Sequence, residues 1–518
     1  MTGTTQQRWP VGRLRTGGAP PVLVVLAVAV ALVSLVPLGF VVSSVIDAGP
    51  ERAWALIARP RVGTLLRNTG LLTVLTMLGA AVLGTLCAFV VERTTVPGAR
   101  FWAPLLVAPL AVPAFVTSYG WVSVVPGIDG LGGATLIMTL AYFPLVYLPV
   151  GAALRQLDPA WEEQARSLGQ SGLRAFASVT LPQLRPALLG GSLLVGLHTL
   201  SEFGAFQSLR FSTFTTAIYE QFQSTFASAA GNMLAVVLVL CCLVLVSAEY
   251  GLGRRRIARV GAGTPRPPTC IRLGRGTVPA LVGLAAVVGA ALGVPLSSVA
   301  YWLWIGGAQV WTGTVFSATL STVGLGLAAA AVTTVLAFPV CYLVVRHWRP
   351  LAVLAERVGY VAAAVPSLVV GLALVSVTVH IPPIYQTSVT LVLGYLLLFL
   401  PRAMVPLRAG LTQSRRELEE ASRALGQSRT ATLRRVTLPL AAPGIATAAA
   451  LVFLATTTEL TATLMLGPTG LRTLATRFWS LTGSIDYVAA APYAGLMIMV
   501  SAPVTYLLLL QSRRVAGR

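Results

Sequence analysis

Residues 162–182 read EEQARSLGQSGLRAFASVTLP, and residues 419–439 read EEASRALGQSRTATLRRVTLP, in one register without insertion or deletion. The second segment begins 257 residues after the first. Both are polar segments in a chain that is 56% hydrophobic and only 10% charged. A polar segment that occurs twice at one register indicates a surface that two similar partners recognise.

The composition of the chain is that of a membrane protein. Globular chains carry about 25% charged residues, and the mean hydropathy here is +0.80. Apolar runs long enough to cross a bilayer recur along the 518 residues. We expect an all-α polytopic membrane protein with about twelve transmembrane helices, at residues 21–45, 68–91, 102–125, 134–154, 187–207, 230–249, 278–304, 317–345, 357–378, 387–408, 444–466 and 487–511.

The spans divide into two repeats of six. Ala111-Val112-Pro113 in the third span corresponds to Ala364-Val365-Pro366 in the ninth. Because each repeat has an even number of spans, both repeats have the same orientation. The expected organisation is an N-terminal segment, a first domain, a basic and proline-containing linker, a second domain and a tail, at residues 1–20, 21–249, 250–277, 278–511 and 512–518.

Arginine predicts the orientation of the chain in the membrane. All 37 basic residues are arginine, and 30 of them lie on or near cytoplasmic segments if both termini are inside. The opposite orientation would contradict the positive-inside rule. We therefore expect cytoplasmic N and C termini, a retained first span rather than a cleaved signal peptide, and seven outer arginines: Arg52, Arg59, Arg61, Arg67, Arg210, Arg472 and Arg477.

The residue types that are absent or scattered exclude several functions. A phosphate-binding P-loop requires lysine, so any ATP-driven role needs ATPase subunits on another chain. The net charge of +21 is explained by cytoplasmic loops and does not indicate nucleic acid. The five cysteines show no metal-site or redox spacing, and the three histidines are scattered, so no cofactor is expected.

Each repeated polar segment lies between the fourth and fifth spans of its half. Its start is rich in helix formers, and Gly169 and Gly426 are suited to end a helix in the left-handed conformation. Leu-Pro then opens the next span, since proline is tolerated in a first helical turn. An ordinary cytoplasmic loop would explain one such segment, but two copies in one frame favour a shared function.

The pattern resembles the EAA loop of binding-protein-dependent ABC importer permeases. That loop has Glu-Ala-Ala, three residues, Gly, nine residues, a branched apolar residue, one residue and Leu-Pro. The matching segments are 163–182 and 420–439, and each copy departs from the pattern at one alanine. In that family the loop is a coupling helix that docks into a groove on an ATPase subunit.

The resemblance implies a role for six residues of the two loops. The glutamates are expected to anchor the loops through charge-assisted hydrogen bonds, the alanines to permit close approach, and the glycines to turn the chain. These ATPase-coupling residues are Glu163, Ala165, Gly169, Glu420, Ala421 and Gly426.

Other segments resemble the fused, two-domain permeases of the ferric-iron branch of that family: residues 201–205, 214–219, 458–464, 467–470 and 473–479. This resemblance implies a transport subunit without catalytic residues in the bacterial cytoplasmic membrane. It implies two ATPase subunits, an extracytoplasmic solute-binding protein and ferric iron as the cargo. Thiamine, phosphonate, polyamine and sulfate permeases are similar. An ion-coupled secondary transporter and a scaffold without transport activity are alternatives of other classes.

Two acidic residues inside the spans are candidates for the translocation path. Glu202 and Glu459 are 257 residues apart, near the outer ends of spans five and eleven. An acidic residue in a span is costly and suggests function. The alternatives are that each caps a helix, pairs with an arginine or lies in the outer headgroup zone. Tyr119 and kinks at Pro113 and Pro366 are further path candidates, and the metal ligands, if any, are not identifiable.

Overall fold

The computed structural model describes residues 21–224, 228–253, 270–347, 350–362 and 364–516. These residues form helices, and the only β contact among them is an isolated bridge between Thr94 and Ile271. The predicted all-α fold is therefore confirmed. The expected N-terminal segment 1–20 and most of the expected linker, residues 254–269, lie outside the described residues.

The order of helices along the chain is similar in the two halves. The first half contains α1 Pro21–Ser34, α2 Val36–Ala48, α3 Pro50–Ile57, α4 Pro60–Arg93, α5 Ala99–Val107, η1 Ala108–Ala111, α6 Ala114–Val124, α7 Gly130–Tyr142, α8 Pro144–Gln156, α9 Ala160–Ser167, α10 Gly172–Ala175, η2 Phe176–Thr180, α11 Leu181–Ser201, α12 Gly204–Ser208, α13 Phe214–Ser224 and α14 Ser228–Gly253. The second half contains η3 Gly274–Gly276, α15 Thr277–Val288, η4 Gly289–Gly293, α16 Val294–Gly306, η5 Gly307–Val310, α17 Gly313–His347, α18 Pro350–Ala362, α19 Ser367–Thr378, α20 Ser388–Gln413, α21 Arg416–Ala424, α22 Arg429–Thr432, η6 Leu433–Thr437, α23 Leu438–Thr457, α24 Thr461–Leu466, α25 Leu474–Gly483 and α26 Tyr487–Ala516.

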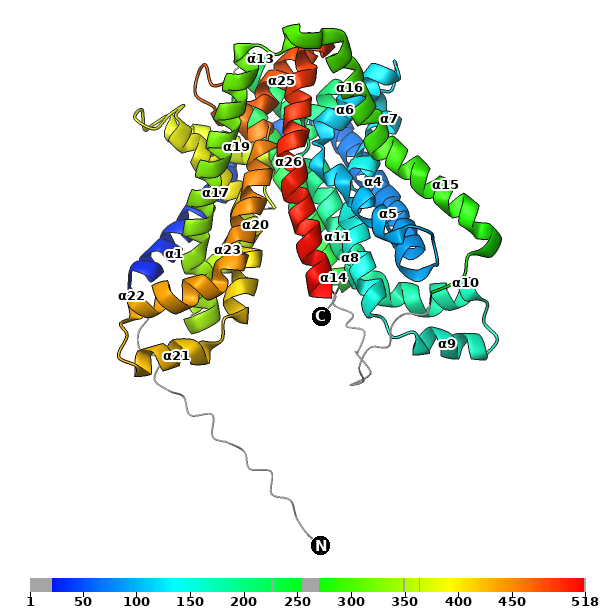
Figure 1. Cartoon of the computed structure of the whole chain (residues 1–518). Helices are drawn as coiled ribbons and strands as arrows, with labels where there is room; N and C mark the ends of the chain where they lie inside the picture. Colours follow the sequence, from blue (N-terminus) through cyan, green and yellow to red (C-terminus); the bar gives the residue numbers. More distant parts are fainter. Residues whose placement is uncertain (1–20, 225–227, 254–269, 348–349, 363, 517–518) are drawn as a thin grey trace.

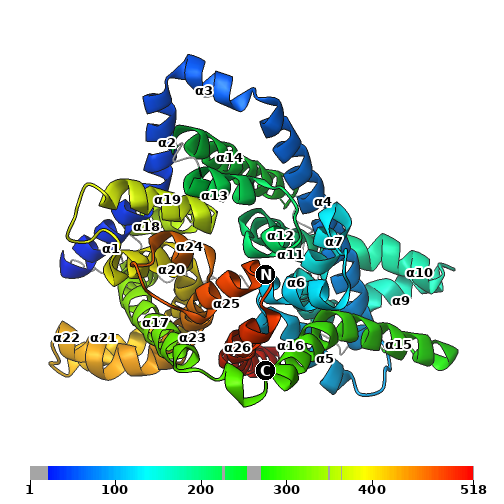
Figure 2. The same ribbon diagram turned by 90° about the horizontal axis from the view of Figure 1, so that it is seen from above.

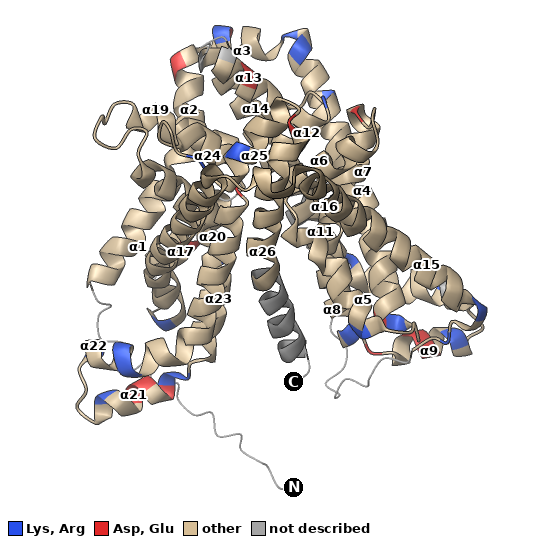
Figure 3. Ribbon diagram, turned by 45° about the horizontal axis from the view of Figure 1, so that its top comes forward, with Lys and Arg blue, Asp and Glu red and all other residues tan. Residues whose placement is uncertain are grey.

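Figure 1 shows two groups of helices that meet at the upper end of the molecule and diverge toward the lower end. The short helices α9 and α10 form the foot of one group, and α21 and α22 form the foot of the other. Seen from above, the two feet lie on opposite sides (Figure 2). Charged residues gather at the feet and at the upper end, and few lie between (Figure 3). The repeated polar segments therefore occupy one end of the molecule.

The first helices of the two halves are exchanged. Helix α1 packs against α17 and α18 of the second half, and α2 packs against α19. Correspondingly, α16 packs against α6 and α15 against α5, both in the first half. One large apolar core accordingly contains Ala27 and Val30 of α1 together with Val340 of α17. The boundary between the repeats in sequence is thus not a boundary in space, and the two halves cannot separate without exposing apolar surface.

Two of the predicted spans are sharply bent at proline. The segment Ala99–Ala111 makes an angle of 95° with Ala114–Val124, and Leu351–Ala362 makes an angle of 109° with Ser367–Thr378. Pro113 and Pro366 are the residues that precede the second helix of each pair, with nearly identical backbone angles. Proline cannot continue the preceding helix but fits before a new one. The predicted kinks are therefore confirmed, and they are equivalent in the two halves.

Helix length and apolar character limit the number of membrane spans in the described residues to between seven and ten. Within the described residues, seven helices are long and apolar enough to cross a bilayer, and three bent pairs raise the number to ten. The third pair is Gly130–Tyr142 with Pro144–Gln156, at 42°. The count of twelve and the orientation of the termini stay predictions.

Glycine allows the spans behind each foot to pack closely. A Cβ atom on Gly191 of α11 would lie 2.8 Å from the carbonyl oxygen of Leu145 in α8. A Cβ atom on Gly444 of α23 would lie 2.7 Å from the carbonyl oxygen of Pro406 in α20. Neither backbone oxygen can move aside without distorting its helix. Small residues at helix contacts are the usual means of close packing in membranes.

Replacing Gly191 by alanine is expected to destabilise the α8–α11 contact, whereas Gly190→Ala is the matched control. A Cβ atom on Gly190 meets nothing within 4 Å, and both substitutions gain the same helix propensity. Overpacking costs about 1–3 kcal/mol, so Gly191→Ala should lower the apparent unfolding temperature in detergent relative to Gly190→Ala. Equal unfolding temperatures would contradict the proposed packing role.

Candidate functional site

The two repeated polar segments fold in the same way. Helix α9 ends before Gly169, which has φ +85°, and α21 ends before Gly426, which has φ +81°. A short helix and one π-helical turn follow in each copy, and Leu181 and Leu438 then begin α11 and α23. The predicted order of helix, glycine turn, helix and Leu-Pro start is confirmed in both copies.

A buried carboxylate attaches the first foot to a long helix. Glu162 is only 6% exposed. One of its oxygens lies 2.5 Å from a guanidinium nitrogen of Arg93, the last residue of α4, and accepts a hydrogen bond of 3.3 Å from the hydroxyl of Thr180. Its other oxygen lies 2.7 Å from Arg166, one helical turn further along α9. The side chain of Arg93 is also buried, so this ion pair is shielded from water.

The second foot is attached by the same groups. Glu419 is 2% exposed and lies 2.8 Å from Arg346, which stands near the end of α17. The hydroxyl of Thr437 donates a hydrogen bond of 2.9 Å to the carboxylate, and Arg346 also donates to the carbonyl oxygen of Ser414. Each foot is therefore held to the end of a helix of 34 or 35 residues.

The buried glutamate of each foot is the first of the pair, and the second is exposed. The resemblance assigns the charge-assisted bonds to Glu163 and Glu420, but both side chains are exposed, and Glu420 makes a surface ion pair of 3.2 Å with Arg416. In α9 the buried positions are Glu162 and Ala165, three residues apart and hence on one helix face. Glu163 points about 100° away from that face and is accessible to a partner.

The two alanines of the pattern occupy different environments. Ala165 is buried, whereas Ala421 is exposed. In the common register, Ser422 takes the place of Ala165, is half-buried and shares a hydrogen bond of 3.1 Å with Thr432. Close approach to the following helix therefore occurs at Ala165 and Ser422.

Two leucines on the feet were not singled out from the sequence. Leu168 is 84% exposed and Leu425 is 83% exposed, each directly before the glycine turn. Trp161 and Leu418, which are also equivalent in the repeat, are exposed at the start of the same helices. An apolar side chain in the same place on both polar feet is the signal that would have identified them. Matching exposed apolar residues indicate a surface that a partner covers.

The candidate acids of the spans cap short helices. Glu202 follows α11 and accepts a hydrogen bond of 3.1 Å from the backbone nitrogen of Ala205, in α12. Glu459 follows α23 and accepts one of 3.0 Å from the backbone nitrogen of Ala462, in α24. The hydroxyl of Tyr142 donates a further bond of 3.1 Å to Glu202. Both carboxylates are half-buried. Of the alternatives for these two acids, the structure shows helix capping.

Tyr119 joins the halves. Its side chain is 2% exposed, and its hydroxyl donates a hydrogen bond to the backbone oxygen of Tyr487. Its ring forms a T-shaped pair with Phe478, with the ring centres 5.2 Å apart. Tyr119, in α6 of the first half, thus contacts α25 and α26 of the second half. Pro113 and Pro366 stand at the two sharp bends, directly before α6 and α19.

The sequence reasoning missed a polar contact between the halves. Arg402 lies in the middle of α20. Its guanidinium lies 3.4 Å from the ring nitrogen Nε2 of His198 in α11 and 5.3 Å from the ring centre of Phe399. A charged residue inside a predicted span was the available signal. The part of the chain that the structure describes contains no group of three or more His, Cys, Asp or Glu residues able to hold a metal ion.

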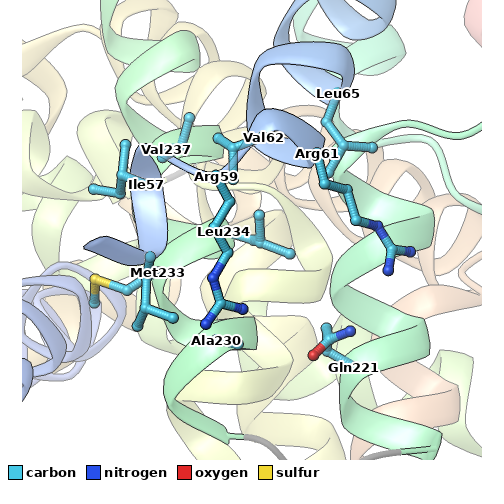
Figure 4. A pocket seen from close by; sticks show the side chains of 11 residues that line it. Ile57, Arg59, Arg61, Val62, Leu65, Gln221, Ala230, Met233, Leu234 and Val237 are labelled. Carbon is cyan, nitrogen blue, oxygen red and sulfur yellow. The ribbon is translucent and has the colours of Figure 1, made fainter. Parts of the chain in front are cut away.

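A small pocket opens at the end opposite the feet, between α3, α4, α13 and α14. It is lined by apolar residues, by Gln221 and by Arg59 and Arg61, whose side chains diverge (Figure 4). Arg61 also forms an exposed ion pair of 2.6 Å with Glu220. This end of the molecule thus presents basic side chains beside apolar ones.

Replacing Glu162 by alanine is expected to loosen the first foot. The substitution leaves Arg93 buried without its counter-charge, and breaking a buried ion pair costs about 3–5 kcal/mol. Hydrogen–deuterium exchange over residues 160–180 should become faster. Glu163→Ala removes the same charge from the exposed side of α9 and should leave that exchange unchanged. Equal exchange in the two variants would contradict the assignment of Glu162 as the anchor.

Comparison with known proteins identifies the family. A family model described as "Binding-protein-dependent transport system inner membrane component" matches residues 80–257 and again residues 340–517, so that each match contains one foot. The chain is 36% identical over 495 residues to the Fe(3+)-transport system permease protein FbpB 2 of Haemophilus influenzae, covering 94% of this chain and 97% of that protein.

Two further relatives are more distant. The chain is 24% identical over 405 residues to the ferric transport system permease protein FbpB of Actinobacillus pleuropneumoniae, covering 72% of this chain and 57% of that protein. It is 28% identical over 239 residues to the sulfate transport system permease protein CysT of Salmonella typhimurium, covering 42% of this chain and 86% of that protein. The chain therefore belongs to the binding-protein-dependent transport system inner membrane components, as a tandem fusion of two such domains in a multi-pass protein of the bacterial inner membrane.

Proposed function

We propose that this chain is the membrane subunit of an ATP-driven importer for ferric iron. The observation that carries the proposal is the 36% identity to a Fe(3+)-transport permease over 94% of the chain. A match of that extent includes both feet, the bent spans and the contact between the halves. The chain contains no lysine and hence no P-loop, so ATP is hydrolysed on separate subunits.

Each foot binds one ATPase subunit. The contact surface comprises the exposed leucine before the glycine turn and the exposed second glutamate, namely Leu168 with Glu163 and Leu425 with Glu420. A leucine enters an apolar groove of the partner, and the carboxylate accepts charge-assisted hydrogen bonds at its edge. Two equivalent feet on one chain imply two ATPase subunits.

The buried ion pairs transmit the movement of the ATPase subunits. When the subunits close on ATP, the two feet approach each other, and the attachments at Arg93 and Arg346 carry α4 and α17 along. These helices extend from the feet to the upper end of the molecule. The opening between the halves then changes from one side of the membrane to the other.

The binding protein docks at the end opposite the feet. This end carries Arg59 and Arg61 beside the pocket of Figure 4, and Arg52 and Arg67 nearby in sequence. Basic side chains at an exposed surface favour a partner whose docking face is acidic, and such charges chiefly increase the rate of association. The cargo is released from the binding protein into the space between the halves.

Sulfate is the second candidate cargo. The sulfate permease CysT aligns with 42% of this chain at 28% identity, which is a weaker and shorter similarity than that to the iron permease. The architecture and the two ATPase subunits would be the same. An ion-coupled secondary transporter has no use for two matched feet with exposed leucines.

Replacing the docking residues is expected to weaken the association with the ATPase subunits. The variant Glu163→Ala with Glu420→Ala, and separately Leu168→Asp with Leu425→Asp, should reduce co-purification of the ATPase while membrane insertion stays intact. The leucine variant should have the larger effect, because it places a charge in an apolar groove. Arg174→Ala with Arg434→Ala, on the following exposed turns, is the control. Unchanged co-purification and transport would remove the docking assignment.

Iron uptake tests the cargo. A strain without its own ferric uptake system, carrying this chain with its ATPase and binding protein, is expected to accumulate ⁵⁵Fe in an ATP-dependent manner. Omission of the binding protein is the control and should abolish accumulation. Uptake of [³⁵S]sulfate without uptake of iron would replace the proposed cargo, and transport without the ATPase would contradict the importer class.

A further inference from the structure

A polar contact joins the two halves. Arg402, in the middle of α20, donates a hydrogen bond of 3.4 Å to Nε2 of His198, in α11. The ring of His198 in turn lies 5.3 Å from the ring of Tyr142. Arg402 is exposed although it lies inside a long apolar helix, and His198 is half-buried. Because the two residues come from different halves, Arg402 faces the junction between the halves.

The repeat does not need this contact for its fold. The position equivalent to Arg402 in the first half is Leu145, since Pro144 and Pro401 align, as do Pro149 and Pro406. The position equivalent to His198 in the second half is Ala455. Each half therefore forms the same helices with an apolar residue at the corresponding place. A charge that folding does not need and that is costly in a span points to function.

The geometry determines which hydrogen-bonding groups are available. Nδ1 of His198 lies 2.8 Å from the backbone oxygen of Leu194 and must donate to it, so Nε2 carries the lone pair that accepts from Arg402. A guanidinium has five N–H donors. Among the described residues, Arg402 uses one of them, and its guanidinium carbon lies over the ring of Phe399. Because the side chain of Arg402 is exposed, the other donors are available to a ligand.

The nearby acids do not neutralise this cation by direct contact. In the part of the chain that the structure describes, no ion pair within 4.0 Å joins Arg402 to an acid. Glu459 caps α24, and Glu202 caps α12 and accepts from Tyr142. The carboxylates are thus held by backbone and tyrosine donors, while Arg402 faces the junction.

We propose that Arg402 and His198 form a site for an oxyanion, through which the cargo passes between the halves. A planar guanidinium with free N–H donors matches the oxygens of phosphate, sulfate, carbonate or a carboxylate, and arginine lines anion-conducting pores for the same reason. The proposal rests on the proposed function only for the identity of the cargo.

The site specifies the chemical form in which iron crosses. A bare Fe³⁺ ion would be repelled by the guanidinium, and the described residues contain no cluster of ligands able to hold it. A ferric ion whose coordination is completed by an oxyanion presents oxygen atoms to Arg402 instead. The chain therefore carries ferric iron together with an oxyanion ligand, or carries an oxyanion alone.

Direct binding tests the site without transport. The full chain in detergent is titrated with [³³P]phosphate, [³⁵S]sulfate and ⁵⁵Fe(III) with phosphate in equilibrium dialysis. Wild type and Arg402→Lys should bind at least one of these probes. Arg402→Leu should lower the affinity about ten-fold or more, and His198→Ala should lower it by a smaller factor. Arg402→Leu and His198→Ala introduce the residues that the other half has naturally, so the fold should be retained.

A matched control separates the site from general electrostatics. Arg415→Leu removes the same charge from an exposed residue two positions after the end of α20, and should bind the probes as wild type does. Equal affinity in Arg402→Leu and wild type, an equal loss in Arg415→Leu, or no saturable binding of any probe to wild type would overturn the proposal.

Uptake measurements distinguish a ferric–oxyanion complex from a free oxyanion, and they test the site separately from the proposed cargo. Loss of ⁵⁵Fe uptake in Arg402→Leu, with retention in Arg402→Lys, would support a ferric–oxyanion complex, and loss of [³⁵S]sulfate uptake alone would support a free oxyanion. If wild type imports neither, the proposed function fails while the dialysis result still decides the site. If wild type imports iron and Arg402→Leu imports it equally well, the site fails while the proposed function stands.

Discussion

A buried carboxylate meets a buried guanidinium at the foot of each half, and the attachment of each foot to the rest of the molecule depends on this contact. Glu162 with Arg93, and Glu419 with Arg346, connect a short surface helix to the end of a long one. Because the pairs are shielded from water, neither partner can leave without a large free-energy cost. Each foot is therefore fixed to the end of α4 or of α17.

The two halves are alike at their feet and different where they meet each other. Both feet have the same anchor, glycine turn and exposed leucine. The bends at Pro113 and Pro366 and the caps at Glu202 and Glu459 also recur. The contact between Arg402 and His198 breaks this symmetry.

Local features of the fold were predictable because their causes lie within a few residues. Glycine after a polar helix, Leu-Pro at the start of a span and proline at the two kinks all act through backbone conformation. The exchange of α1 and α15–α16 between the halves was not predictable, because apolar helices of similar composition pack equally well in several places. The contact of Arg402 with His198 was not predictable for a related reason: a count of charges per segment does not show which residue of another helix each charge meets.

The sequence by itself determined the class of the protein: an all-α membrane chain with two equivalent polar feet and no P-loop of its own. These conclusions follow from composition, repetition and the absence of one residue type. Only the tertiary structure decided that Glu162, not Glu163, is the buried anchor, and that Arg402 meets His198 across the junction. The first depends on which helix face turns inward, and the second on a contact between residues 204 positions apart. Neither a side chain's direction nor a distant neighbour is encoded in local sequence.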